Sequence, residues 1–159
     1  MKQLLSACAG QYTTTQLLNT EADMLGVFGF DLIINSTFKF YEPLAKISGL
    51  EAKNMHLGQY VLELALFKTK FLEYTPSMMA CACIYLIKKI RKCDNSWNDQ
   101  LVKLVGYREN DLKSCAKELC SLLEEASEMT NCKAIKKKFS LPAFHEVTKI
   151  RLERKEARK

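Results

Sequence analysis

The sequence PSMMACACIYLIKKI of residues 76–90, preceded by Thr75, decides the fold of this chain. A threonine followed by proline is typical of a helix start, because threonine can cap a helix and proline fits its first position. The ten residues from Met78 to Ile87 are apolar on all sides of such a helix, and residues 80–83 (ACAC) are small. Small side chains let other helices approach closely, and a helix that is apolar all round is a buried one. We therefore predict that residues 76–90 form the central, buried helix of the domain.

Helical patterns also occupy most of the remaining chain. Apolar residues recur at steps of three and four, which is the spacing of one helix face. This spacing predicts helices over residues 13–28, 53–70, 97–104, 109–126 and 130–138, another that starts near Ser36, and a short one within residues 1–9. Residues 29–36 (GFDLIIN and Ser36) break the pattern, and we expect a linker whose apolar side chains pack against the helices.

The composition is that of a globular protein that is not embedded in a membrane. Hydrophobic residues make up 48% of the 159 residues and charged residues 26%. The longest apolar run is about half of what a membrane-spanning helix needs. The formal net charge is +6, but residues 133–159 alone hold ten Lys and Arg against three Glu. Because the rest of the chain is close to neutral, we expect a basic C-terminal tail and do not expect nucleic acid as a partner.

The sequence shows no pattern typical of catalysis or of metal binding. The two histidines, His56 and His145, are far apart in the chain, and seven cysteines are present. Cys81 and Cys83 would point about 200° away from each other on a helix, so they cannot bind one ion together, and we interpret them as packing residues. We therefore expect no enzyme activity, no metal and no cofactor. The odd number of cysteines and the absence of a secretion signal favour a reducing compartment.

Three stretches occur in an order that identifies a family. Residues 12–32 (YTTTQLLNTEADMLGVFGFDL) resemble the pattern Y-T-x-x-Q-[IVL]-L-x-x-E-x-x-[IVL]-L followed by F-D-L, with Met at position 24. Residues 60–86 (YVLELALFKTKFLEYTPSMMACACIYL) resemble Y-L-x-E-L-x-L followed by Y-x-P-S and a run of alanines. Residues 97–112 (WNDQLVKLVGYRENDL) fit W-x-x-x-L-x-x-x-x-G-Y-x-x-x-D-L. Residues 37–48 (TFKFYEPLAKIS) and 136–150 (KKKFSLPAFHEVTKI) add two further matches. Together, over about residues 11–150, these stretches resemble the mitotic A- and B-type cyclins.

The resemblance implies an all-α fold with three parts. Residues 1–32 would be a remnant of the N-terminal cyclin box, with its last helix at residues 13–28, and residues 33–148 would be the C-terminal cyclin box. The latter is a five-helix bundle around a central buried helix, here preceded by one or two helices left from the first box. Residues 149–159 would be a basic flexible tail. The first-box motif M-R-x-I-L-x-D-W has no counterpart, so we expect a fragment or a truncated form of a longer cyclin.

The resemblance also implies a function. Cyclins have no reaction chemistry of their own; they bind and activate a cyclin-dependent protein kinase in the control of cell division, in the nucleus and cytoplasm. By position in the family, the residues expected to contact the kinase are Leu18, Glu21, Ala22, Leu25, Phe30 and Leu32. Leu18, Leu25 and Phe30 are equally well explained as part of the packed core. Glu21 is the best candidate, because a carboxylate beside an apolar stripe can accept a hydrogen bond from a partner's donor.

Other functions stay open. The cyclin-box fold is shared with nucleic-acid-binding adaptors of the transcription-factor-IIB type, which the basic tail would suit and the neutral body argues against. A stand-alone helical scaffold is the third alternative. The apolar stripe of residues 13–28 would lack the cover of a complete first box, so we expect that this helix packs against the second box or mediates self-association.

Overall fold

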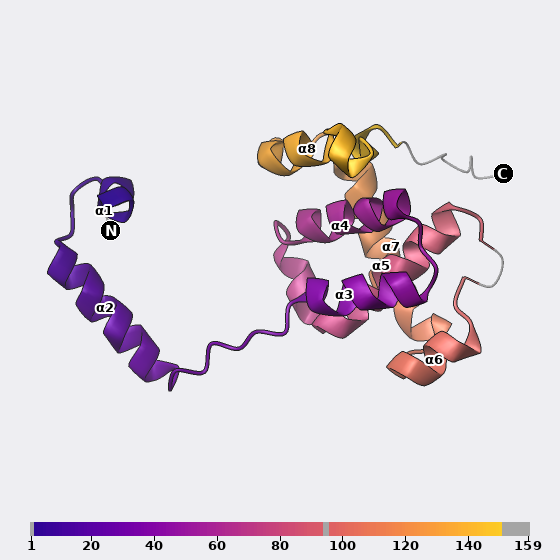
Figure 1. The fold of residues 1–159 in the computed structure, drawn as a ribbon, viewed down its shortest axis with the longest axis horizontal. Helices are drawn as coiled ribbons and strands as arrows, with labels where there is room; N and C mark the ends of the chain where they lie inside the picture. The colour runs from indigo at the N-terminus through magenta and orange to yellow at the C-terminus, as the bar shows by residue number, and fades with distance from the viewer. Residues whose placement is uncertain (1, 94–95, 151–159) are drawn as a thin grey trace. The chain divides into compact units, whose positions relative to one another are not determined.

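The computed structural model describes residues 2–93 and 96–150, and every regular element in these ranges is helical. The all-α fold class predicted from the sequence is thus confirmed. The chain forms two compact units, one up to Ile34 and the other from Asn35 onwards (Figure 1). Within the described ranges, every helix is too short or too polar to cross a lipid bilayer.

The first unit consists of α1 (Lys2–Ala7) and α2 (Thr14–Val27). A capping box starts α2: the Thr13 hydroxyl accepts a hydrogen bond from the Gln16 amide at 3.2 Å, and the Gln16 side chain accepts one from the Thr13 amide at 2.8 Å. Neither helix buries a residue. The apolar stripe of α2 therefore remains open to solvent within this unit.

The linker that follows α2 has little cover within the first unit. Gly29 and Phe30 both have positive φ angles, of 56° and 59°, and end the helix. Residues 31–36 have no regular secondary structure, and Leu32, Ile33 and Ile34 are 58%, 84% and 77% exposed. The packing of this linker against the helices of the second unit stays a prediction.

The second unit is built around one central helix (Figure 1). Its elements are α3 (Thr37–Ile47), α4 (Ala52–Ala65), the 3-10 helix η1 (Thr69–Glu73), α5 (Pro76–Ile90), α6 (Asp99–Val105), α7 (Glu109–Glu125), α8 (Lys133–Phe139) and the 3-10 helices η2 (Pro142–Phe144) and η3 (Val147–Lys149). Helices α3, α4 and α7 pack directly on α5, and α8 packs on α4. Residues 80–83 are all 0% exposed, so the prediction of a buried central helix is confirmed.

Local signals in the sequence set the ends of the helices. The Thr75 hydroxyl accepts a hydrogen bond from the Met78 amide at 3.2 Å and caps α5, with proline at the first position. The helix predicted over residues 53–70 ends earlier, at Ala65. The chain turns there and continues as η1, which places Phe71 in the core with 6% exposure.

Helices α3 and α4 meet at a fully buried tyrosine. The Tyr41 side chain is 0% exposed, and its hydroxyl donates a hydrogen bond to the Met55 carbonyl at 2.8 Å. Gly58 lies against the hydroxyl end of the Tyr41 side chain: a Cβ atom added to it would lie 2.1 Å from the Tyr41 hydroxyl oxygen. The close approach of the two helices therefore requires glycine at this position.

The C-terminal end of the second unit extends slightly further than predicted. Lys149 is the last residue of η3, and Ile150 is partly buried against the core. The flexible tail predicted for residues 149–159 otherwise lies outside the described residues.

Candidate partner-binding surface

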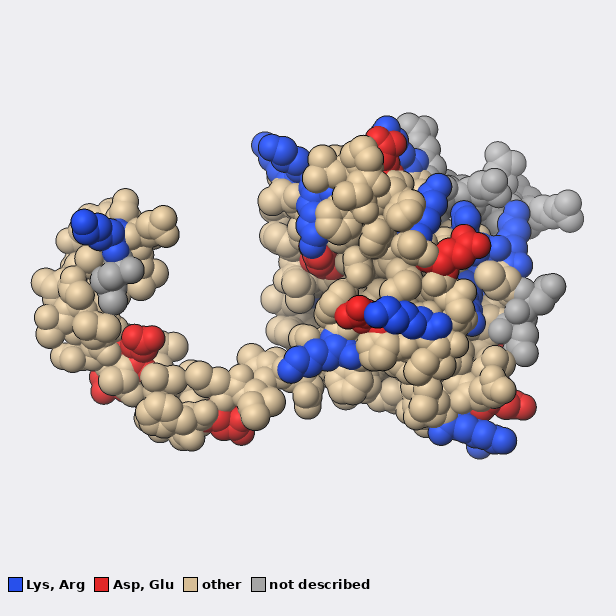
Figure 2. Space-filling view, in the orientation of Figure 1, with Lys and Arg blue, Asp and Glu red and all other residues tan. Residues whose placement is uncertain are grey.

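An apolar groove runs along α2 within the first unit. It has a volume of about 480 Å³ and is lined by α1, by α2 and by the chain after α2: Leu4, Leu17, Thr20, Glu21, Met24, Leu25, Phe28 and Leu32. We call this set the α2 groove. The first unit is poor in charge, since residues 1–34 hold only Lys2, Glu21, Asp23 and Asp31. Figure 2 shows the resulting mostly uncharged surface, whereas charges of both signs are interspersed over the visible face of the second unit.

Helical spacing brings the groove residues of α2 onto one side. At about 100° per residue, Leu17, Met24 and Phe28 follow one another along the same face as Glu21. Leu4 of α1 contributes to the lining from a second helix. Leu4, Met24 and Phe28 are each 53% exposed, so the groove is an apolar surface without a partner inside the described first unit. Apolar surface that stays contiguous and exposed marks an interaction site in many proteins.

Glu21 is the one charged residue of the groove. Among the described residues its carboxylate makes no hydrogen bond and no ion pair, and the side chain is exposed. A carboxylate flanked by apolar side chains can form a charge-assisted hydrogen bond with an Arg or Lys of a partner. The groove thus presents apolar contact area with one fixed acceptor in it.

The structure brings together three of the six contact residues predicted from the sequence. Glu21, Leu25 and Leu32 line the α2 groove. Leu18 and Ala22 lie on the neighbouring face of the helix, and Phe30 follows the break after α2. The alternative role of Leu18 and Phe30 as core residues is not seen in the first unit, where they are 47% and 73% exposed.

Other residues of the groove were not among the predicted kinase contacts. Leu17, Met24 and Phe28 belong to the apolar stripe of residues 13–28, for which the sequence predicted packing against the second box or self-association. Leu4 carried no usable signal, because its short helix could not be positioned against α2 from local patterns alone.

The second unit holds buried thiols that act as packing groups. Burial raises the pKa of both Cys81 and Cys115 to about 12, so these thiols stay protonated at neutral pH. The Cys115 sulfur lies 3.6 Å from the Met79 sulfur, and the Cys83 thiol donates to the Gly58 carbonyl at 3.5 Å. No group of three or more His, Cys, Asp and Glu side chains in residues 2–93 and 96–150 is arranged to hold a metal ion.

Comparisons with known proteins converge on one family. Residues 36–152 match the family model described as "Cyclin, C-terminal domain". The chain is 27% identical over 139 residues to G2/mitotic-specific cyclin-B of Dictyostelium discoideum, covering 87% of the chain and 32% of that protein. It is 28% identical over 137 residues to G2/mitotic-specific cyclin-A of Drosophila melanogaster, covering 86% of the chain and 28% of the relative. Cyclin-A1-4 of Oryza sativa subsp. japonica is 31% identical over 144 residues, covering 87% and 40% respectively. The chain thus spans well under half the length of the relatives that it matches.

Proposed function

The chain belongs to the cyclin family, and we propose that it is a non-enzymatic regulatory subunit that binds a cyclin-dependent protein kinase in the control of cell division. Family membership rests on the match over residues 36–152, and the named relatives are of the mitotic type. The kinase is the partner implied by the resemblance of residues 12–32 to the last helix of the first cyclin box. Binding would favour the active arrangement of the kinase, because a ligand that prefers one of two states shifts the balance towards it.

The observation that carries the proposal is the α2 groove. It combines exposed apolar side chains with a single carboxylate, Glu21, that has no partner in the described first unit. A matching surface on the kinase would present apolar residues and at least one Arg or Lys. Burial of the groove would supply most of the binding free energy, and the charged contact would fix the orientation.

The test is the binding of the purified chain to purified cyclin-dependent kinases by isothermal titration calorimetry. Leu25→Asp places a charge in the groove, and we expect it to weaken binding at least about tenfold, the effect of about 1.4 kcal/mol. Glu21→Ala should weaken binding by a similar factor. Val27→Asp is the matched control, since Val27 is on the same helix, 85% exposed and outside the groove. The proposal would be contradicted if the unaltered chain and the three variants bound the kinase with equal affinity, or if the unaltered chain did not bind at all.

Self-association through residues 13–28 is the competing use of the same surface. A second copy would cover the same apolar side chains, with the two Glu21 carboxylates opposing its approach by like-charge repulsion. Light scattering at several concentrations distinguishes the two uses. A dimer that dissociates on Leu25→Asp, together with no kinase binding, would assign the groove to self-association.

A further inference from the structure

The two histidines of the chain lie side by side in the second unit. They are 89 residues apart in sequence, yet their Nδ1 atoms are 3.0 Å apart. The ring centroids are separated by 5.0 Å and the ring planes are inclined by 45°. His56 is a half-buried residue of α4, and His145 is an exposed residue between η2 and η3. The space beside the two nitrogens is therefore open to small solutes.

The chain around His145 holds its ring against α4. His145 and Glu146 both have left-handed backbone conformations, with φ of 55° and 50°, which non-glycine residues adopt infrequently. Phe144 packs its ring against His56 at 5.3 Å and against Phe139 at 5.0 Å. Val147 is 1% exposed and anchors the other side. The packing of Phe144 and Val147 therefore fixes the position of His145, in addition to the contact between the two imidazoles.

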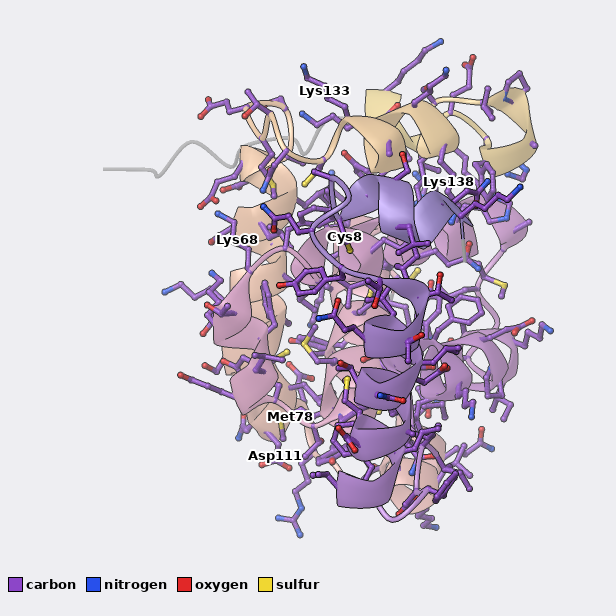
Figure 3. All side chains as sticks on the ribbon, turned by 90° about the vertical axis from the view of Figure 1, so that its left-hand side faces the viewer. Cys8, Lys68, Met78, Asp111, Lys133 and Lys138 are labelled. Carbon is purple, nitrogen blue, oxygen red and sulfur yellow. The ribbon has the colours of Figure 1, made fainter. Side chains whose placement is uncertain are left out.

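A charged side chain reinforces the same junction. Lys138 of α8 bonds to Glu63 of α4, and its ammonium lies 4.8 Å from the centre of the Phe139 ring and 5.5 Å from that of Phe144 (labelled Lys138 in Figure 3). These contacts join α4, α8 and η2 close to the histidine pair. The two imidazoles are consequently held by a framework that exists without any bound ion.

Two imidazole nitrogens that face each other at this distance need a cation or a proton between them. In the free protein, one Nδ1 must carry a proton and donate it to the other. When both imidazoles carry their proton on Nε2, each Nδ1 has a free lone pair, and an ion beside the line between the two nitrogens can bind both. The geometry points to a two-histidine site for a divalent transition-metal ion at His56 and His145.

The distance allows both nitrogens to bind one ion. With metal–nitrogen bonds of about 2.0–2.1 Å, nitrogens 3.0 Å apart subtend an angle of about 94° at the ion. That angle is close to the 90° of tetragonal coordination, which Ni²⁺ and Cu²⁺ adopt with nitrogen ligands. Since Glu146 is engaged by Lys149 at 2.9 Å, and no third ligating side chain joins the pair in the described ranges, water fills the other positions.

Metal binding at this pair would fasten the C-terminal segment to the body of the second unit. The ion would join α4 to the residues between η2 and η3. The two histidines are not held together in the unfolded chain, so the ion binds the folded state preferentially and stabilises it. This role is independent of the α2 groove and of kinase binding.

The test uses the chain without a histidine tag and with Cys8→Ser and Cys93→Ser, which remove two thiols that are open to solvent. Titration with NiCl₂ by calorimetry should show one ion bound per chain, and Ni²⁺ should raise the temperature of thermal unfolding. His56→Gln and His145→Asn should each weaken Ni²⁺ binding at least tenfold. Asparagine is chosen because it tolerates the left-handed backbone at position 145. The exposed α4 residue Lys53, changed to Ala, is the matched control and should bind like the parent.

Two results would overturn the inference. The first is a parent chain that neither binds Ni²⁺ nor gains thermal stability from it at millimolar concentration. The second is unchanged affinity in His56→Gln or His145→Asn when circular dichroism shows the variant to be folded.

Discussion

Replacing Gly58 with alanine should destabilise the second unit strongly. The added Cβ would lie 2.1 Å from the Tyr41 hydroxyl oxygen, 2.6 Å from Cζ and 2.9 Å from Cε2. All three distances are shorter than real Cβ contacts, so the tyrosine ring or the helix must move. The ring is 0% exposed and has no free space to enter. Its movement would also break the hydrogen bond to the Met55 carbonyl.

The magnitude follows from three contributions. Overpacking a core costs about 1–3 kcal/mol. A buried hydroxyl that loses its hydrogen bond costs about 1–3 kcal/mol more. Alanine recovers up to about 1 kcal/mol because it is a better helix former than glycine. We therefore expect Gly58→Ala to lower the free energy of unfolding by about 3 kcal/mol.

Urea unfolding followed by circular dichroism measures this loss, and two comparisons assign it to the tyrosine. Gly26→Ala in α2 is the matched control: a Cβ added there meets no atom within 4 Å, so we expect no loss of stability. In a Tyr41→Phe background the nearest contact and the hydrogen bond are both gone, and Gly58→Ala should cost about 1 kcal/mol less. A free energy of unfolding within about 0.5 kcal/mol of the unaltered chain would refute this account of the contact between α3 and α4.

Three further predictions concern the second unit. Ala82→Leu should cost roughly 1–3 kcal/mol in the same urea assay, because Ala82 is 0% exposed in the central helix, and an unchanged midpoint would contradict this. Desolvation, and then the charge of His145, lower the pKa of His56 below 6.5 in the folded chain. The unfolded chain therefore binds more protons than the folded one, and we expect the free energy of unfolding to fall as the pH drops below about 6.5. His56→Gln should reduce this pH dependence, and an identical slope in both chains would count against it. Lys68→Ala removes an exposed ion pair, in which the Lys68 ammonium lies 3.2 Å from the Glu125 carboxylate (Lys68 is labelled in Figure 3). We expect this variant to lose at most about 1 kcal/mol of unfolding free energy, and a loss of about 2 kcal/mol or more would contradict this expectation.

Elements with strong local signals could be predicted from the sequence. The small residues of positions 80–83 and the start at Thr75 specified α5, because a buried helix needs both. The periodic stripe and Thr13 specified α2 to within one residue at each end. Both features depend on residues three or four positions apart in the sequence, so a local sequence pattern is enough to predict them.

Features that depend on distant contacts could not be predicted in this way. The end of α4 at Ala65 follows from the burial of Phe71, which depends on the core that η1 enters. Leu4 joins the α2 groove only through the placement of α1 beside α2. The pairing of His56 with His145 depends on how the end of the chain returns to α4, and no spacing within the sequence encodes that return.

We propose that a cyclin-dependent kinase binds this chain through the α2 groove. Hydrogen–deuterium exchange of the chain with and without a bound kinase is the sharpest test of this proposal, because it reports protection for each segment. We predict slower exchange of amides in Thr14–Val27 on binding, with no change in α6, and loss of this protection in the Leu25→Asp variant. Protection confined to the second unit, with exchange in α2 unchanged, would contradict it.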